Sequence, residues 1–178
     1  MNNKYQHYAE LSETHGKHVV DNAAHWSDML TTAARLYKYS FDEQLLIHAQ
    51  KPDAIACAEL ALWNKPVGRY VKKGTKGIAL LDDSGGKQKL RYVFDVADTA
   101  EGRHNPKTPY IWQLQEVHQG LITQMLGYSL EDISMLVTEL AKDYIEANLD
   151  DIHHALEGTG NAEAFETTLI ESAVYMIR

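Results

Sequence analysis

The chain has little cysteine, little proline and no long apolar run, and these shortages exclude whole classes of protein. Its single cysteine, Cys57, excludes an internal disulfide framework. Cys57 stands in the apolar stretch A-I-A-C-A, which favours a buried thiol over a nucleophile or a metal ligand. No window approaches the ~18 consecutive apolar residues of a membrane span, and the first residues have no apolar core of a signal peptide. We therefore expect a cytoplasmic protein that does not enter a membrane.

The familiar signatures of catalysis and cofactor binding are also missing. The chain shows no serine elbow, no paired catalytic carboxylates and no dinucleotide-binding fingerprint. The turn K-K-G-T-K-G at 72–77 lacks the order of a phosphate-binding P-loop and is followed by strand residues. Among nine histidines, His15 and His18 form H-x-x-H and His153 adjoins His154, but neither pair has a cysteine companion or an H-E-x-x-H arrangement. We interpret them as surface histidines and expect no enzyme activity, no cofactor and no metal.

What the chain does have is a strongly uneven charge. The net charge is −8 over 178 residues, and the hydrophobic content of 44% is ordinary for a folded domain. Residues 35–110 are net basic, whereas residues 111–178 carry only Lys142 and Arg178 against twelve acids. A basic middle and an acidic last third indicate two surfaces with different roles.

The stretch from Trp63 to Arg91 concentrates the positive charge. It holds eight of the seventeen Lys and Arg residues against two acids, Asp82 and Asp83. A cationic segment on an acidic protein is typical of a surface that binds an anionic partner, and the commonest large anion is nucleic acid. A solvated hairpin whose lysines only maintain solubility explains the charge equally well. Charge alone leaves both interpretations open.

The order of apolar and polar residues predicts an α+β fold, with N-terminal helices packed on a small antiparallel β-meander and an acidic helical extension after them. Apolar residues recur at helical spacing from about His18, and Ser40 with Glu43 three residues later forms a capping-box signature. We expect helices at 18–37, 41–50 and 56–63 and strands at 67–71, 77–81 and 90–96, with a loop over 97–110.

Three parts follow along the chain. We expect a flexible N-terminal arm at 1–17, a nucleic-acid-binding domain at 18–110 and a helical extension at 111–178. Ser129 precedes a capped apolar run, and a final helix begins near Ala162. This helix reaches Arg178 without a stop signal, so we expect the extension to lead into further domains.

The basic strands and turns supply the candidate binding residues. Aromatic side chains alternate with the bases there, and single-stranded nucleic acid is bound by basic grooves with aromatic stacking platforms. Trp63 and Phe94 are expected in the core, and either Tyr70 or Tyr92 is expected to stack on a base. The expected phosphate contacts are Arg69, Lys72, Lys73 and Lys76, and the track is expected to continue through Lys87, Lys89 and Arg91.

Three segments together resemble a known family. They are W-S-D-M-L (Trp26–Leu30), Y-S-F-D-E-Q-L-L-I (Tyr39–Ile47) and A-L-W-N-K-P-V-G-R-Y-V-K-K-G-T-K-G-I (Ala61–Ile78). Over about residues 20–100 the chain is similar to the N-terminal domain of ArdC-type antirestriction proteins. It resembles more closely the version found in LtrC-like proteins and in large helicase and methylase proteins of conjugative elements. The chain departs from the family at Gln44, where the ArdC type tends to have asparagine.

The resemblance implies single-stranded DNA binding during plasmid or transposon transfer. The zinc-peptidase-like domain of ArdC-type proteins is not carried over, because this chain has no H-E-x-x-H. Our first hypothesis is a non-catalytic module that binds single-stranded DNA. The alternative is a protein-interaction or antirestriction module in which the acidic helices of 111–178 contact a protein partner and imitate the charge of DNA.

Overall fold

The structure is a computed structural model that describes residues 3–102, 106–107, 109, 111, 116–157 and 161–177. The chain divides into two compact units, residues 1–112 and 113–178, and each is described by itself. Helices and small antiparallel sheets make up the fold, which confirms the predicted α+β class. Over the ranges described, none of the helices combines the length and the apolar character that a membrane crossing requires.

The first unit begins with a helix where the sequence predicted a flexible arm. Helix α1 spans Asn3–Val19, so the prediction for residues 1–17 was wrong. Tyr5 is buried, and its hydroxyl hydrogen-bonds the carboxylate of Asp83 at 2.9 Å. Tyr8 and Leu11 pack against the main core. Tyr5, Tyr8 and Leu11 recur every three residues and form one apolar stripe. This stripe was overlooked in the sequence because the segment is polar in overall composition.

The next two helices begin where their capping residues predict. Helix α2 spans Ala23–Arg35 and is capped by Asn22, whereas helix α3 spans Phe41–Gln50 and begins with the predicted capping box of Ser40 and Glu43. Gln44 is buried at the start of α3. Its side-chain amide donates to the carbonyl oxygens of Leu36 at 3.1 Å and Tyr39 at 3.0 Å, which follow the end of α2. The position that departs from the ArdC pattern therefore joins two helices.

The predicted helix at 56–63 was wrong over its first half. Residues Cys57–Glu59 form strand β1, Leu60–Leu62 form the single turn α4, and Trp63–Val67 continue as a π-helical turn, η1. Strand β1 pairs antiparallel with β4, Cys57 opposite Asp95. Pairing with a strand almost forty residues away outweighs the helical propensity of the alanine-rich segment.

Two separate sheets replace the predicted meander. Strand β3 spans Ile78–Asp82 and β4 spans Lys89–Asp95, and with β1 they form a three-stranded antiparallel sheet in the order β1-β4-β3. Strand β2 spans Arg69–Val71, and it pairs with β5, Thr99–Glu101, in a two-stranded sheet. The short 3₁₀ turn η2, Val96–Asp98, leads from β4 into β5, which lies in the region predicted as a loop.

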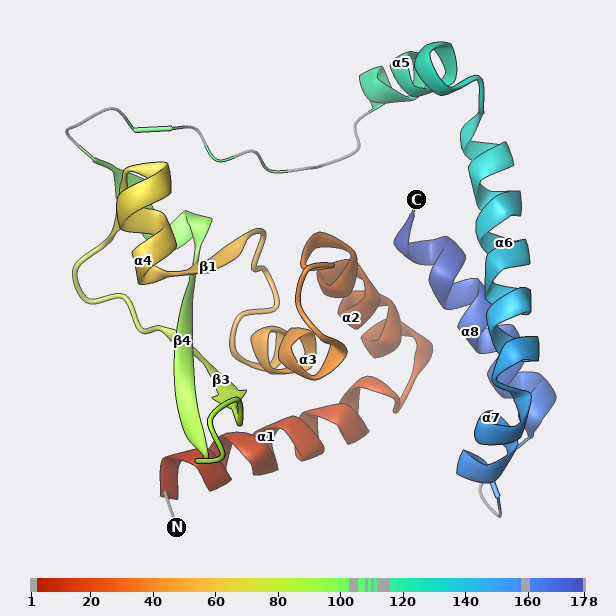
Figure 1. Ribbon diagram of the computed structural model, residues 1–178, viewed down its shortest axis with the longest axis horizontal. Helices are drawn as coiled ribbons and strands as arrows, with labels where there is room; N and C mark the ends of the chain where they lie inside the picture. Colours follow the sequence, from red (N-terminus) through yellow and green to blue (C-terminus); the bar gives the residue numbers. More distant parts are fainter. Residues whose placement is uncertain are drawn as a thin grey trace. The chain divides into compact units, whose positions relative to one another are not determined.

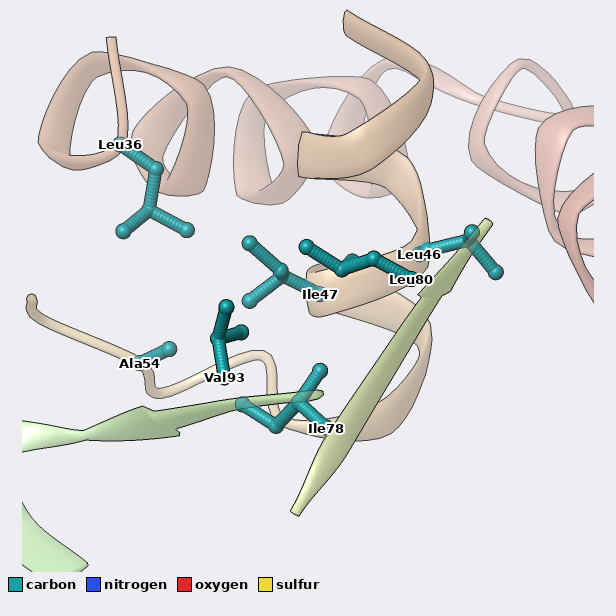
Figure 2. Close-up of a cluster of buried hydrophobic side chains, with 7 residues drawn as sticks. All are labelled: Leu36, Leu46, Ile47, Ala54, Ile78, Leu80 and Val93. Atoms are coloured by element: carbon teal, nitrogen blue, oxygen red, sulfur yellow. The ribbon is translucent and has the colours of Figure 1, made fainter. Parts of the chain in front are cut away.

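The main core lies between the helices and one face of the three-stranded sheet. In Figure 1, α3 lies between α2 and the β3–β4 hairpin, with α1 running beside it. Figure 2 shows the buried side chains gathered around Ile47 of α3. The cluster consists of Leu36, Leu46, Ile47, Ala54, Ile78, Leu80 and Val93. Burial of these apolar surfaces is the main stabilising term, at about 25 cal/mol per Å².

The second unit is helical, as predicted. It contains α5 (Glu116–Leu126), α6 (Leu130–Ala147), α7 (Leu149–Ala155) and α8 (Ala162–Met176). Ser129 and Asp132 form a capping box at the start of α6, and α8 begins at the residue the sequence predicted. Helix α6 packs against α8, and Ala141 and Ile145 are the side chains of α6 that become buried.

A buried carboxylate joins the sheet to the loop before β1. Asp95 is 0% exposed. One oxygen accepts from the backbone N–H groups of Ile55 at 2.8 Å and Ala56 at 2.9 Å, and the other accepts from Ala97 at 3.0 Å. Three hydrogen bonds to one carboxylate offset the cost of removing its charge from water.

We predict that Asp95→Ala lowers the free energy of unfolding by roughly 3 kcal/mol, because it leaves buried N–H donors without an acceptor. Urea denaturation measures the change. The exposed Asp53, in the same loop, provides the control, since Asp53→Ala is expected to change stability by at most about 0.5 kcal/mol. Equal effects of the two substitutions would contradict a special role for Asp95.

Candidate nucleic-acid interface

Three lysines gather on the turn that joins β2 to β3. Lys72, Lys73 and Lys76 are exposed, and Gly74 gives the turn its positive φ of 88°. The ammonium of Lys72 donates to the carbonyl oxygen of Ala97 at 2.8 Å. In the part of the chain that the structure describes, none of the three contacts a carboxylate. Their positive charges therefore remain available to an anionic partner. We call these three residues the turn lysines.

A glycine brings this turn against two aromatic side chains of β4. A Cβ atom placed on Gly77 would lie 3.1 Å from Phe94 Cζ and 3.3 Å from Tyr92 Cβ. These contacts are tighter than ordinary van der Waals packing, so the backbone of residue 77 approaches the Phe94 ring and Tyr92 Cβ this closely because it has no side chain. Gly77 follows Lys76, so the lysine turn ends against the face of β4 that carries Phe94 and Tyr92.

Tyr92 and Phe94 share the face of the sheet that is turned away from the main core. Successive residues of a strand point to opposite faces, and Val93, between them, belongs to the core cluster. Tyr92 lies opposite Ala79 on β3 and is 43% exposed, whereas Phe94 is half-buried. An exposed aromatic ring on the strand against which the lysine turn ends can stack on a base while the lysines contact phosphates of the same nucleic acid strand.

Three predicted site residues form hydrogen bonds or ion pairs with other residues of the chain. Arg69 donates to Thr99 Oγ1 at 2.8 Å and lies 3.7 Å from Glu101 across the two-stranded sheet. Lys89 pairs with Asp82 at 3.1 Å. Each of these two cations already has an acidic partner, which reduces the charge it can offer to phosphate.

Arg91 is the third of them. It forms ion pairs with Glu43 of α3 and Glu59 of β1, and its guanidinium lies 5.8 Å from the centre of the Tyr39 ring. Strand alternation places Arg91 on the opposite face of β4 from Tyr92. It therefore ties the sheet to α3 and does not lie beside the turn lysines on the sheet.

Lys87 lies at the opposite end of the hairpin. The turn lysines precede β3 and Lys87 follows it, so the length of the strand, roughly 14 Å, separates them. Two acids, Asp82 and Asp83, offset the lysines at that end. Asp82 accepts from the hydroxyl of Ser84 at 2.6 Å, from its N–H at 2.9 Å and from Lys89, which hold the pKa of Asp82 at about 2. The structure therefore does not bring the predicted track together as one continuous surface.

Tyr70 lies in the other sheet. It faces Ala100 of β5 and is 51% exposed, and alternation along the strand gives it the same side as Lys72. Both rings that the sequence offered as stacking platforms are accessible, and Tyr92 is the one whose Cβ lies close to Gly77 at the end of the lysine turn.

The two aromatic residues predicted for the core differ. Trp63 is buried, and its Nε1 donates to the carbonyl oxygen of Phe94 at 2.9 Å, which confirms the prediction. Phe94 is half-buried, so that prediction was wrong for part of its ring. Cys57 is also half-buried, and burial followed by the nearby Asp95 charge raises the pKa of its thiol to about 12. A thiol with so high a pKa is a poor nucleophile at neutral pH.

Sequence reasoning missed a hollow with basic residues on this unit. It has a volume of about 620 Å³, and Lys38, Lys65, Arg91, Tyr39 and Glu59 are among the residues that line it. Lys65 belonged to the cationic segment but was not singled out, and Lys38 lies outside that segment. Only pairing of β1 with β4 brings them to one hollow, so no local pattern signalled it.

Comparison with protein-family models, with curated proteins and with solved structures finds no significant match for this chain.

Proposed function

We propose that the first unit is a non-catalytic module that binds single-stranded DNA, acting in the cytoplasm as part of a mobile-element protein such as one from a conjugative transposon or plasmid. The observation that carries the proposal is a turn with three exposed lysines, none paired with a carboxylate among the described residues, that ends against β4, the strand with the exposed ring of Tyr92. Cations and stacking platforms in alternation are what a flexible strand with exposed bases requires. The resemblance to the ArdC-type N-terminal domain supports the same assignment and supplies the biological setting.

The binding mode follows from the chemistry of these groups. The ammonium groups of Lys73 and Lys76 neutralise neighbouring phosphates, and Lys72 joins them once it releases the Ala97 carbonyl. Phosphate contacts of this kind carry no sequence information. Tyr92 stacks on one base, and stacking is available to every base because each has a π-face. The module therefore binds with little sequence preference and requires unpaired bases.

We expect the triple charge reversal Lys72→Glu, Lys73→Glu and Lys76→Glu to abolish binding to a labelled strand of about 20 nucleotides. For single strands each phosphate contact contributes a slope of about −0.7 in a plot of log affinity against log salt, so neutral substitutions at the three positions should flatten that slope by about 2. Fluorescence anisotropy over a range of salt concentrations measures both quantities.

The control reverses Lys4, Lys17 and Lys142, which are also exposed and whose reversal changes the net charge by the same amount. Its affinity should remain close to that of the unaltered protein. Unchanged affinity in the turn-lysine variant would refute the proposal. A duplex of the same sequence, bound as tightly as the single strand, would refute the preference for unpaired bases.

Tyr92→Ala is expected to weaken single-strand binding by about 1–3 kcal/mol, the range measured for loss of one base–aromatic stack. Tyr92→Phe keeps the ring and should keep the affinity. Tyr70→Ala removes the other exposed ring, and the geometry predicts a smaller effect. If Tyr70→Ala weakens single-strand binding and Tyr92→Ala does not, the binding face lies on the two-stranded sheet and not on the three-stranded one.

The second unit supports a second candidate function, contact with a protein partner or antirestriction. On α6, Leu136, Leu140 and Tyr144 recur every four residues and are 57%, 57% and 59% exposed. They form an apolar stripe on a strongly acidic helical unit, and exposed apolar patches with polar surroundings mark interaction surfaces. The charge suits a basic partner, including a protein whose usual ligand is DNA.

A chain that ends at Trp112 separates the two functions. It keeps the whole first unit, so we expect it to bind single-stranded DNA with unchanged affinity, and to lose any protein partner held by α6. Fluorescence anisotropy measures DNA binding by the truncated chain. A pull-down measures partner binding, with Leu136→Glu/Leu140→Glu as the matched variant. Loss of DNA binding on truncation would contradict the assignment of binding to the first unit alone.

A further inference from the structure

Four histidines from three helices lie close together, at the end of α1, the start of α2 and the end of α3. His15 and His18 lie in the last turns of α1, His25 lies in the first turn of α2, and His48 lies in the last turn of α3. The ring centroids are 5.0 Å apart for His48 and His15, 5.9 Å for His15 and His18, and 4.0 Å for His18 and His25. All four line one hollow with a volume of about 550 Å³.

Three donor groups in this cluster converge on one point. A nitrogen of His18, a nitrogen of His25 and a carboxylate oxygen of Asp21 all lie within 4.8 Å of one another. Donors bound to one ion at 2.0–2.2 Å can be no farther apart than about 4.4 Å, so small side-chain rotations are enough to bring all three onto a metal. His18 Nδ1 already lies 3.6 Å from Asp21 Oδ2.

The surroundings of His25 prepare it to act as a ligand. Its Nδ1 lies 3.2 Å from the carbonyl oxygen of His18 and 3.0 Å from the side-chain amide nitrogen of Asn22. With its proton on Nδ1, the ring donates to the carbonyl oxygen of His18, and Nε2 then has the free lone pair that a metal ion requires. A histidine whose second nitrogen is held by a backbone carbonyl is the usual arrangement in metal sites, because that hydrogen bond fixes the orientation of the ring. Asn22 also caps α2, which fixes the position of this turn.

We propose that His18, Asp21 and His25 form a binding site for a divalent transition-metal ion of the Zn²⁺ type. Two imidazoles and one carboxylate are a donor set that zinc accepts, and three protein ligands leave a coordination position for water or another molecule. His18 and Asp21 are exposed and the site adjoins the hollow, so that position is accessible. The ion joins the end of α1 to the start of α2 and lies apart from the residues proposed to bind DNA.

This site revises the interpretation of the histidines drawn from the sequence. H-x-x-H at 15–18 was interpreted as a pair of surface histidines because it has no cysteine companion and no H-E-x-x-H arrangement. Asp21 and His25 supply the missing donors from the turn between two helices, and His15 is held against His48 by a hydrogen bond of 2.7 Å, leaving His18 as the ligand from that pair.

Zinc titration of the tag-free, chelator-stripped protein against a chromophoric competitor tests the proposal. We expect one equivalent of Zn²⁺ to bind and to raise Tm, because the ion binds the folded state. His18→Gln/His25→Gln should lower the affinity by about tenfold or more, since even groups that only orient a ligand are worth about 10- to 100-fold. Asp21→Asn should weaken binding in the same direction.

The matched control is His153→Gln/His154→Gln, which removes two adjacent histidines of the second unit and should leave zinc affinity unchanged. An equal affinity in the His18/His25 variant and the unaltered protein would overturn the site. If that variant fails to fold, NMR of the unaltered protein replaces it. Zinc should then shift the imidazole signals of His18 and His25 before those of His153 and His154, and the reverse order would overturn the proposal.

Discussion

The buried carboxylate of Asp95 constrains the whole arrangement of the first unit. Its three backbone partners lie before β1 and after β4, so one side chain determines how the helical part of the chain enters the sheet and how the chain leaves it. Because β1 is held against β4 at this point, α4 and η1 follow in a position where Trp63 is buried. Because Asp95 caps η2 directly after β4, β5 leaves the main sheet and pairs with β2.

This second pairing decides which basic residues face solvent. With β2 paired to β5, the turn to β3 connects the two sheets. Its lysines contact no carboxylate among the described residues. Arg69, Lys89 and Arg91 of the cationic segment contribute to the fold through ion pairs. Arg91 is the clearest case, since it links α3, β1 and β4 through Glu43 and Glu59. A segment that looks uniformly basic in the sequence therefore divides into structural cations and available ones.

Helix ends organise the first unit as much as its core does. Gln44 satisfies carbonyl groups after α2, and the side-chain amide of Gln50 hydrogen-bonds both the N–H and the carbonyl of Ala79 on the outer strand β3. That amide covers part of a strand edge that would otherwise be open to pairing with another chain. The histidines gather at such ends too, where short turns bring residues of different helices within a few ångströms.

The sequence by itself determined the features that depend on neighbouring residues. Capping boxes at Ser40 and Ser129, the apolar period of α2, α3 and α6, and the three main strands could all be predicted, because a helix or strand is specified by spacing within about ten residues. The α+β class and the cationic character of the β2–β3 turn followed from the same local patterns.

Only the tertiary structure decided the pairing of β2 with β5, the helical α1 docked through Tyr5, and the strand in place of the helix at Cys57. It also decided that the lysine turn ends against the β4 face of Tyr92, that Arg91 lies on the opposite face, and that the α1–α2 turn gathers His18, Asp21 and His25. Apart from this last group, whose members lie within eight positions of one another, these features rest on contacts between residues far apart in the chain or on docking against a completed core.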